Sequence, residues 1–494
     1  MAISMHRSTP CITKSFINNS KYTSLARGFN SLMNATLGLA LAMTMAGCHK
    51  SADPATGGAQ VAKKSTTNVV AKQTPTSIPL PPLPEGGVKG IYLTGWTAGL
   101  HNRLNALCAM ADRTDINAMV IDVKDDGQLS YPVDVPLAQD AHASLKMYNV
   151  DKVIATLNSH HIWPIARIAC MRDTPLAKAH PELAVHGPDG QIWHDRSRHY
   201  WLNPYKKEVW DYNVDVALDA IKHGFKEIQF DYVRFPSEGK ISTLQYPGKP
   251  KDSHRSDQIT AFLKYAEDKV HAHGAYFSAD VFGLIATVER RHNRLHPEDV
   301  PAGTSDPTGQ TNKMGLGRPG MPSSSVQPGQ TAISATPASL DGKAPAPGSA
   351  KRTRKVSKGT RKTGFNDTIA QDMGIGQIFT HLAANVDYMC PMAYPSHYAH
   401  GEFGVANPNF EPYKIITKSV GDSKMLLAST PKCKLRPWIQ DFTLGPPHYG
   451  PTEVKAQIKA LSDLGIHEYL LWNAGCRYTE AAYGKKSSTG ATAQ

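Results

Sequence analysis

Eight short apolar runs, rich in β-branched and aromatic residues, alternate with longer helical patterns along most of the chain. This alternation constrains the fold more than any other feature, because it is the pattern of βα units that assemble into a parallel sheet. Helical patterns cover residues 103–113, 150–159, 206–224, 258–273, 374–386 and 452–465. The apolar runs are residues 90–96 (GIYLTGW), 118–124 (AMVIDVK), 164–170 (PIARIAC), 227–233 (EIQFDYV), 275–283 (AYFSADVFG), 386–394 (VDYMCPMAY), 424–430 (KMLLAST) and 468–474 (EYLLWNA).

Eight parallel strands that alternate with helices are most simply closed as a (β/α)8 barrel, since closure leaves no unpaired strand edge. The sequence therefore predicts an α/β protein with a TIM barrel over residues 88–480. An open, doubly wound sheet is the alternative. Against it, the turn after Gly95 reads WTAGLHNR and lacks the spaced glycines that bind a dinucleotide. We therefore expect no cofactor.

The fourth run, residues 227–236 (EIQFDYVRFP), leads from an apolar strand directly into Asp231, Tyr232 and Arg234. A charged side chain is costly to remove from water unless it is paired, so a carboxylate at this point indicates a functional site or a structural Asp–Arg pair. In a barrel, the active site lies at the carboxyl ends of the strands. Asp231 therefore has a position from which it could act on a substrate.

Polar and aromatic side chains also stand at the ends of most other predicted strands. Alternation along a strand would place Asp122 with Lys124, Gln229 with Asp231, and Ser278 with Asp280 on common faces. Several of these side chains could then point into one barrel mouth. The strand-end residues are Asp122, Lys124, Asp125, Arg167, Asp231, Arg234, Asp280, Tyr394, His397, Trp472 and Asn473.

Several longer stretches make the chain similar to a known family. Among them are VKGIYLTGWTAG, AMVIDVKDD, NPYKKEVWDYN, EIQFDYVRFPSEG, VDYMCPMAYPSHY, RPWIQDFT and LLWNAGCRYT. The chain resembles the bacterial putative glycosyl hydrolase family, formerly catalogued as a domain of unknown function and distantly similar to amylase-like TIM-barrel glycosidases. The resemblance implies a barrel fold and a glycosidase activity.

Glycoside hydrolysis requires two carboxyl groups, one protonated as an acid and one ionised as a nucleophile or base. In amylase-like barrels these groups follow strands four and five, so the resemblance implies Asp231 as nucleophile or base and Asp280 as acid. The chain departs from that pattern in two ways. The acid is an aspartate instead of a glutamate, and Arg234 follows the nucleophile although the usual arginine precedes it. Asp122, Asp125 and Asp387 are therefore alternative acids, and retaining and inverting outcomes both stay open.

Aromatic side chains near the predicted mouth suit a carbohydrate, because sugar rings present C–H faces that pack on aromatic surfaces. The candidates are Trp96, Trp201, Tyr232, Tyr394 and Trp472, and core packing is the alternative for each of them. The segment between Trp193 and Trp201 also carries four basic or imidazole groups. That segment could favour an anionic or amino-sugar polymer, or it could simply be a solvated loop.

The first part of the chain reads as an export signal. Residues 37–46 (LGLALAMTMA) form a short apolar core after Lys21 and Arg27. Met45-Ala46-Gly47-Cys48 resembles a bacterial lipobox, which predicts a signal peptide over residues 1–48 and a lipid on Cys48; plain secretion is the alternative. Residues 49–87 read as a disordered tether. We expect a lipoprotein of the cell envelope, and His49 favours the outer membrane, facing the periplasm or the surface.

Residues 302–364, after strand five, are rich in Gly, Pro, Ser and Thr and predict a disordered insertion; residues 481–494 predict a disordered tail. The insertion ends in KRTRKVSKGTRK (351–362), where seven of twelve residues are Lys or Arg, so much of the net charge of +12 is local. No aromatic interleaving or recognition motif accompanies this run. We therefore expect contact with anionic lipids, lipopolysaccharide or acidic glycans and no contact with nucleic acid.

The mature chain would keep five cysteines after Cys48, an odd number that cannot all pair internally. A Cys433–Cys476 disulfide is one arrangement that an oxidising compartment would allow. No Cys/His spacing suggests a zinc site, so we expect no structural metal.

The sequence as a whole predicts a glycoside hydrolase that acts on a cell-envelope or extracellular polysaccharide, without a cofactor. Two alternatives remain. One is a non-catalytic barrel that binds a carbohydrate, which the aromatic and basic groups would serve equally well. The other is a metal-assisted polysaccharide deacetylase, for which the required Asp/His spacing is not evident.

Overall fold

The computed structural model describes residues 78–296 and 371–486. The predicted signal peptide with Cys48, tether residues 49–77, the insertion at 302–364 and the last eight residues of the tail lie outside the described residues.

Eight parallel strands form a closed barrel, which confirms the predicted fold. Each strand pairs with its neighbour around the circle, and β1 pairs with both β10 and β2, which closes it. Two short strands are added: β8 (Lys434–Leu435) pairs with β7, and β3 (Gln128–Leu129) lies antiparallel to β2. The barrel strands are β1 (Lys89–Leu93), β2 (Ala118–Asp125), β4 (Trp163–Ala169), β5 (Glu227–Asp231), β6 (Tyr276–Phe282), β7 (Tyr388–Met392), β9 (Trp438–Gln440) and β10 (Tyr469–Trp472).

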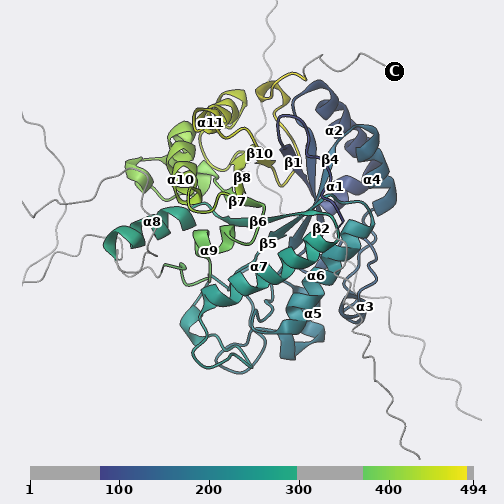
Figure 1. Ribbon diagram of the computed structural model, residues 1–494, viewed down its shortest axis with the longest axis vertical. Coiled ribbons are helices and arrows are strands. Elements are labelled where there is room, and N and C mark those ends of the chain that lie inside the picture. Colours follow the sequence, from purple (N-terminus) through teal and green to yellow (C-terminus); the bar gives the residue numbers. More distant parts are fainter. Residues whose placement is uncertain (1–77, 297–370, 487–494) are drawn as a thin grey trace, which may run out of the picture. The chain divides into compact units, whose positions relative to one another are not determined.

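Helices surround the strands in an outer layer (Figure 1). No helix among the described residues is long and apolar enough to span a bilayer. The α-helices are α1 (Gly95–Gly99), α2 (His101–Arg113), α3 (Pro136–Asp140), α4 (Val150–Ser159), α5 (Thr174–Ala179), α6 (Lys207–Lys222), α7 (Arg255–Ala272), α8 (Ile285–Leu295), α9 (Phe379–Ala383), α10 (Pro412–Leu427) and α11 (Pro451–Asp463).

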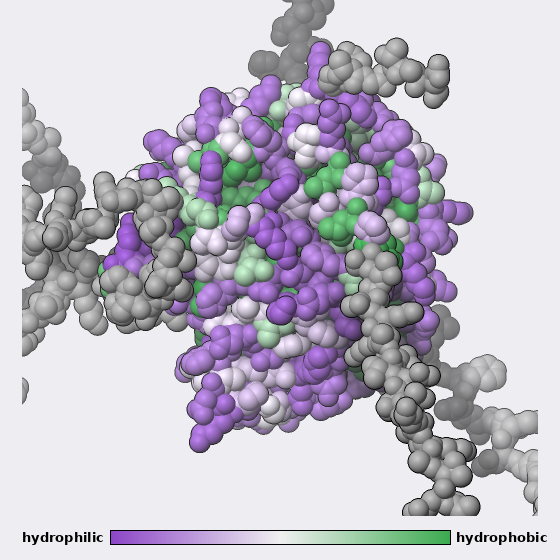
Figure 2. Space-filling model, viewed as in Figure 1, coloured by the Kyte–Doolittle hydropathy of each residue, from purple (hydrophilic) through white to green (hydrophobic). Residues whose placement is uncertain are grey.

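The core has two layers because successive side chains of a strand point to opposite faces. In β2, Val120 packs inside the barrel, whereas Ile121 packs in the layer between the barrel and the helices. On the face seen in Figure 2, the surface is mainly hydrophilic, with small separate apolar patches. The buried interior residues are Val88, Tyr92, Ala118, Val120, Trp163, Ile165, Tyr388, Cys390, Tyr394, Trp438, Leu470 and Cys476.

A buried ion-pair network closes the amino-terminal end of the barrel. Arg436 donates from Nη1 to both carboxylate oxygens of Glu227, at 2.6 and 2.7 Å, and from Nη2 to Glu468 at 2.9 Å. Its guanidinium also lies 3.6 Å from the centre of the Tyr388 ring. The active sites of such barrels lie at the opposite end, where the strands have their carboxyl termini.

The predicted seventh strand is wrong. Residues 424–427 end helix α10, in which Ile416, Val420 and Leu427 are buried at helical spacing, and residues 428–430 follow it as a turn. The seventh position in the barrel is filled by β9, which follows the short strand β8 within the stretch CKLRPWIQ. A short apolar run does not distinguish a strand from a buried helix turn, and Arg436 and Pro437 made the real strand resemble a loop.

Both ends of the predicted barrel domain also need correction. Leu83, assigned to the tether, packs against the interior cluster, and Asn117 donates to the carbonyl of Gly87. Tyr483, assigned to the tail, is buried and donates its hydroxyl to Asp441. Residues 78–87 and 481–486 therefore lie against the barrel, since each segment contains apolar groups that the barrel buries.

All five cysteines in the described part of the chain are free and buried. Cys433 precedes β8, whereas Cys476 follows β10 and accepts a hydrogen bond from the backbone of Thr94. They lie near opposite ends of parallel strands. The disulfide that the sequence allowed between them is therefore excluded by the topology.

Candidate active site

Arg167 of β4 lies at the centre of the barrel mouth and joins two carboxylates. It donates from Nη2 to Asp231 of β5 at 2.6 Å and from Nη1 to Asp122 of β2 at 2.6 Å. Asp125, at the end of β2, lies 3.4 Å from the same Nη1. The arginine is 3% exposed, so its two short ion pairs are shielded from water. Charge-assisted hydrogen bonds are stronger in such a buried setting than in water.

Asp122 has a second partner that the sequence analysis missed. The hydroxyl of Tyr92, in β1, donates to Asp122 at 2.5 Å, and the Tyr92 ring stacks on Trp472 of β10 with centroids 4.0 Å apart. Burial raises the pKa of Asp122 to about 7, while Arg167 favours its ionised form. The first, second and last strands are thus tied together at one edge of the mouth.

Asp280 of β6 is held by an indole. Trp438 of β9 donates from Nε1 to Oδ1 of Asp280 at 2.7 Å, and both residues are buried. Oδ2 of Asp280 has no hydrogen-bond partner among the described residues, yet it is not sealed from solvent. Burial raises the pKa of Asp280 well above its usual range, and the nearby negative charge of Asp231 raises it further. Both effects favour the protonated form of Asp280.

Asp231 and Asp280 are neighbours across the sheet. Phe230 of β5 is in register with Ala279 of β6, so the two aspartates occupy the next position on adjacent strands. Adjacent strands lie about 4.8 Å apart, and residues in register on parallel strands project to the same face. The two carboxyl groups therefore share one side of the mouth in different surroundings, one beside a guanidinium and one beside an indole.

The backbone bends sharply after Asp231. Tyr232 has a φ of 50°, in the left-handed region that a residue with a bulky side chain rarely adopts. The bend turns the backbone N–H of Tyr232 toward Oδ1 of Asp231, at 2.6 Å. Strained residues of this kind persist where the surrounding structure holds them in place, and they cluster at functional sites.

A second arginine, Arg172, covers the rim next to Asp231. Its guanidinium lies 3.9 Å from the centre of the Tyr232 ring, and it donates to the Tyr232 hydroxyl at 2.5 Å. It also pairs with Asp125 at 3.3 Å and lies 3.8 Å from Asp126. Arg172 was absent from the residues predicted from sequence; it lies in the loop between β4 and α5.

Arg234 lies on the same rim. Its guanidinium is surrounded by three aromatic rings, those of Trp201, Phe282 and Tyr232, at 4.8, 4.9 and 5.3 Å. Trp201 is buried and donates to Asp195, so it supports the arginine and presents little surface to a ligand.

Lys124 does not point into the mouth, so its predicted position beside Asp122 is wrong. The register between β2 and β4 shifts between these two residues, and the bulge turns Lys124 toward helix α6. There its ammonium is fully buried and bonded to Asp173 at 2.9 Å and Asn213 at 2.8 Å. A substrate cannot reach it, and the ion pair is part of the outer core.

The other predicted contact residues differ in accessibility. Trp96 is 61% exposed and lies on α1 directly after β1, whereas Tyr394 is buried against Trp472. His397 is exposed and contacts the Tyr394 ring with centroids 5.4 Å apart. Asn473 uses its amide within the protein: it donates to the carbonyls of Asp441, directly after β9, and of Arg477, and it accepts from the N–H of Gly475. The amide therefore stabilises the loop.

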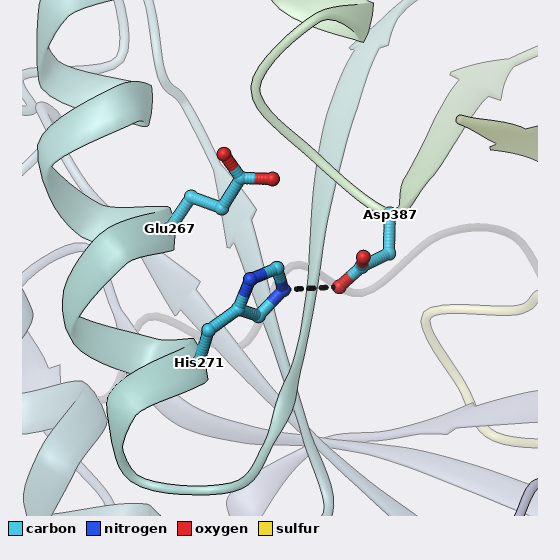
Figure 3. A group of neighbouring side chains, drawn as sticks. All are labelled: Glu267, His271 and Asp387. Carbon is cyan, nitrogen blue, oxygen red and sulfur yellow. Dashed lines mark hydrogen bonds and ion pairs between the residues drawn. The ribbon is translucent and has the colours of Figure 1, made fainter. Parts of the chain in front are cut away.

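Three residues that could hold a metal ion lie at the other end of the barrel. Among the described residues, Glu267, His271 and Asp387 bring their ligand atoms within 4.8 Å of one another (Figure 3). His271 bonds Asp387 at 2.7 Å, and the ammonium of Lys432 pairs with Glu267, so the group forms an ion-pair network that would repel an added cation. Asp387 precedes β7, so it is wrong as an alternative acid: it lies at the amino-terminal end of the strands.

The two aromatic partners that the sequence analysis missed share one property. Tyr92 and Trp438 lie inside strands and read as ordinary core residues. Their partners, Asp122 and Asp280, are 30 and 158 residues away along the chain. No local pattern reports such a pairing.

A family model described as a putative glycosyl hydrolase domain matches residues 90–295 and 356–478, more than half of the chain. The chain belongs to this family. The match confirms the resemblance found in the sequence, and it is interrupted where the insertion was predicted. A search of curated proteins finds no match.

Solved structures show more distant likenesses. A hypothetical protein from Ruminiclostridium thermocellum is 40% identical over 39% of this chain and 97% of its own, with a TM-score of 0.35. The spore cortex-lytic enzyme SleL of Bacillus megaterium is 9% identical over 80% of this chain and 72% of its own, with a TM-score of 0.40. The alpha-galactosidase AgaA of Geobacillus stearothermophilus is 13% identical over 39% of this chain and 27% of its own, with a TM-score of 0.30.

Proposed function

We propose that this protein hydrolyses glycosidic bonds of a cell-envelope or extracellular polysaccharide, with Asp280 as the acid and Asp231 as the nucleophile or base. The observation that carries the proposal is the pair of carboxyl groups on adjacent strands with contrasting environments. Hydrolysis requires that one carboxyl group is protonated while the other is ionised. Membership of a glycosyl hydrolase family supports the same activity.

Asp280 suits the acid. Burial raises its pKa, and Trp438 occupies Oδ1, so the proton is left on Oδ2, which has no hydrogen-bond partner among the described residues. In the first step this proton passes to the glycosidic oxygen as the bond to the anomeric carbon breaks. The leaving sugar then departs as a neutral alcohol.

Asp231 suits the ionised partner. Arg167 donates to its Oδ2 through Nε and Nη2, at 3.1 and 2.6 Å, and the backbone N–H of Tyr232 donates to Oδ1. These donors stabilise a carboxylate and hold it in one orientation. From there it could attack the anomeric carbon directly or take a proton from an attacking water. Arg167 therefore acts as a positioning residue.

The test is hydrolysis of a panel of envelope and extracellular glycans by wild-type protein, Asp231→Asn and Asp280→Asn. Loss of the acid is expected to lower kcat/KM by about 10²- to 10⁴-fold. The matched control is Asp215→Asn, which removes an exposed carboxylate from α6. Equal product release from wild-type protein and Asp231→Asn would refute the role of Asp231. Binding of a glycan without product from any variant would favour a carbohydrate-binding barrel.

We also propose that the protein is exported and anchored through a lipid on Cys48. The support is the lipobox-like sequence before this cysteine. Metabolic labelling with a fatty acid should mark wild-type protein and leave Cys48→Ser unlabelled, with Cys11→Ser as the control. Equal labelling of the Cys48 variant would contradict the anchor.

A further inference from the structure

The arginine on the rim, Arg234, lacks a counter-charge. Among the described residues, Arg167 and Arg172 each pair with aspartates, whereas no carboxylate lies within ion-pair distance of Arg234. Its side chain is partly buried, and burial lowers its pKa to about 10, so it is still a cation at neutral pH. A cation withdrawn from water without a partner is costly, which indicates that a ligand supplies the missing charge.

One edge of the Arg234 guanidinium is available for that ligand. Nη1 donates to the carbonyl of Phe235 at 3.0 Å and to the hydroxyl of Ser237 at 3.2 Å, which fixes the group in place. Nε and Nη2 have no partner among the described residues, and neither is a fully buried atom. Together these two nitrogens form one edge of the guanidinium, and arginine uses this edge to bind both oxygens of a carboxylate at once.

The free edge of Arg234 lies on the same rim as the two candidate catalytic aspartates. Arg234 is three residues beyond Asp231, and its guanidinium contacts Phe282, which is two residues beyond Asp280. It also shares the Tyr232 ring with Arg172. A group bound by Arg234 would therefore belong to the sugar at or next to the bond that is cleaved. The three surrounding rings bury part of the guanidinium, and partial removal from water strengthens a charge pair.

We propose that Arg234 recognises the carboxylate of an acidic sugar, so that the polysaccharide contains uronic acids or other carboxylated sugars. This inference rests on the proposed function for the class of polymer. It goes beyond it by naming the chemistry of the sugar and the residue that selects it.

The experiment measures binding by titration calorimetry, without turnover. The probes are oligosaccharides of galacturonate, glucuronate and mannuronate, each compared with its carboxyl-reduced, neutral counterpart. At least one acidic member should bind about tenfold more tightly than its reduced form, the gain expected of a charge-assisted hydrogen-bonded pair. Arg234→Gln should abolish this preference. Arg234→Lys, which keeps the charge and loses the two-nitrogen edge, should keep only part of it.

Two controls separate recognition from other effects. Arg198→Gln removes an exposed positive charge from the loop before Trp201 and should leave the preference unchanged. Ser237→Ala removes a hydrogen bond that holds Arg234 in place but keeps its positive charge. This variant tests whether a change in the loop alone explains a loss of the preference for acidic oligosaccharides. Thermal unfolding of each variant establishes that it is folded.

Three results would overturn the inference. They are equal binding of acidic and reduced oligosaccharides, a preference that survives in Arg234→Gln, and a preference for sulfated over desulfated glycans with none for carboxylates. Because no turnover is needed, the outcome is independent of the hydrolysis test. A protein that binds uronates through Arg234 and cleaves nothing would refute the proposed hydrolase and leave this inference standing.

Discussion

At the scale of single residues, the two aspartates of the barrel mouth differ in the groups that donate hydrogen bonds to them. Asp231 is bonded by a guanidinium and a backbone N–H, whereas Asp280 is bonded by one indole N–H in a buried setting. Donors of this kind favour the charged form of a carboxyl group, and burial favours the neutral form. The balance at Asp280 is set by burial, so its indole partner can be removed to test the assignment.

Trp438→Phe should move the alkaline limb of the pH profile of kcat/KM upward by about one pH unit. The indole N–H stabilises the ionised form of Asp280, so its loss raises the pKa of the acid further. The matched control is Trp163→Phe, which replaces another buried interior indole with a phenyl ring. Nε1 of Trp163 has no hydrogen-bond partner among the described residues. A limb that moves equally in both variants, or downward in Trp438→Phe, would contradict the role of this bond.

Lys124→Met should destabilise the fold by about 3–5 kcal/mol, because it leaves the carboxylate of Asp173 buried without a counter-charge. The measurement is the free energy of unfolding in denaturant. Lys152→Met, at an exposed position of α4, should change it by less than about 0.5 kcal/mol. If Lys124→Met were as stable as wild type but bound substrate more weakly, the structural role would be contradicted, and Lys124 would contact the substrate as the sequence predicted.

At the scale of elements, the two ends of the barrel have different tasks. The carboxyl ends of the strands hold the candidate catalytic groups, while the amino-terminal ends are closed by the Arg436 network and by the group around Asp387. In the latter, His271 near the end of α7 is joined to the residue that precedes β7. This ion pair couples a helix to the next strand of the barrel, and its strength depends on pH.

His271→Gln should remove a pH dependence of stability above about pH 6.5. The hydrogen bond to Asp387 raises the pKa of His271. The folded state therefore binds the proton more tightly than the unfolded chain. The stabilisation is complete below the unfolded pKa and is lost as pH rises through the folded pKa. Unfolding free energies at pH 6 and pH 8.5 should converge in the variant. His101→Gln, exposed on α2, should retain the wild-type slope, and an unchanged slope in His271→Gln would refute the coupling.

At the scale of the whole molecule, the fold depends on residues matched by the family model and on short segments at each end. The match stops at residue 295 and resumes at 356, so the gap covers most of residues 302–364, where composition predicts an insertion without a core. By contrast, residues 481–486 contain Ala482 and Tyr483, both buried against the barrel. The number of residues in a segment therefore does not indicate how much that segment stabilises the fold.

Deletion of residues 302–350, replaced by a short Gly/Ser linker, should leave the melting temperature within a few degrees of wild type, because the deleted composition offers little apolar surface to bury. The matched truncation ends the chain at Thr479, which removes the hydroxyl that Tyr483 donates to Asp441, and it should lower the melting temperature. Calorimetry compares the three proteins. A large destabilisation by the deletion would show that the insertion packs on the barrel.

Seven of the eight barrel strands, the family and the positions of Asp231 and Asp280 could be read from the sequence, because strand periodicity and strand ends are local properties. The partners of those residues could not. Arg167 joins aspartates 45 and 64 residues away, and Trp438 lies in a strand that local composition disguised as a loop. A single bulge in β2 was enough to turn Lys124 out of the mouth, since a shift of one residue moves a side chain to the opposite face. Register and bulges arise from pairing between distant segments, so only the closed barrel decides which charges meet: Arg167 and Arg172 pair with aspartates, whereas Arg234 has no carboxylate partner among the described residues.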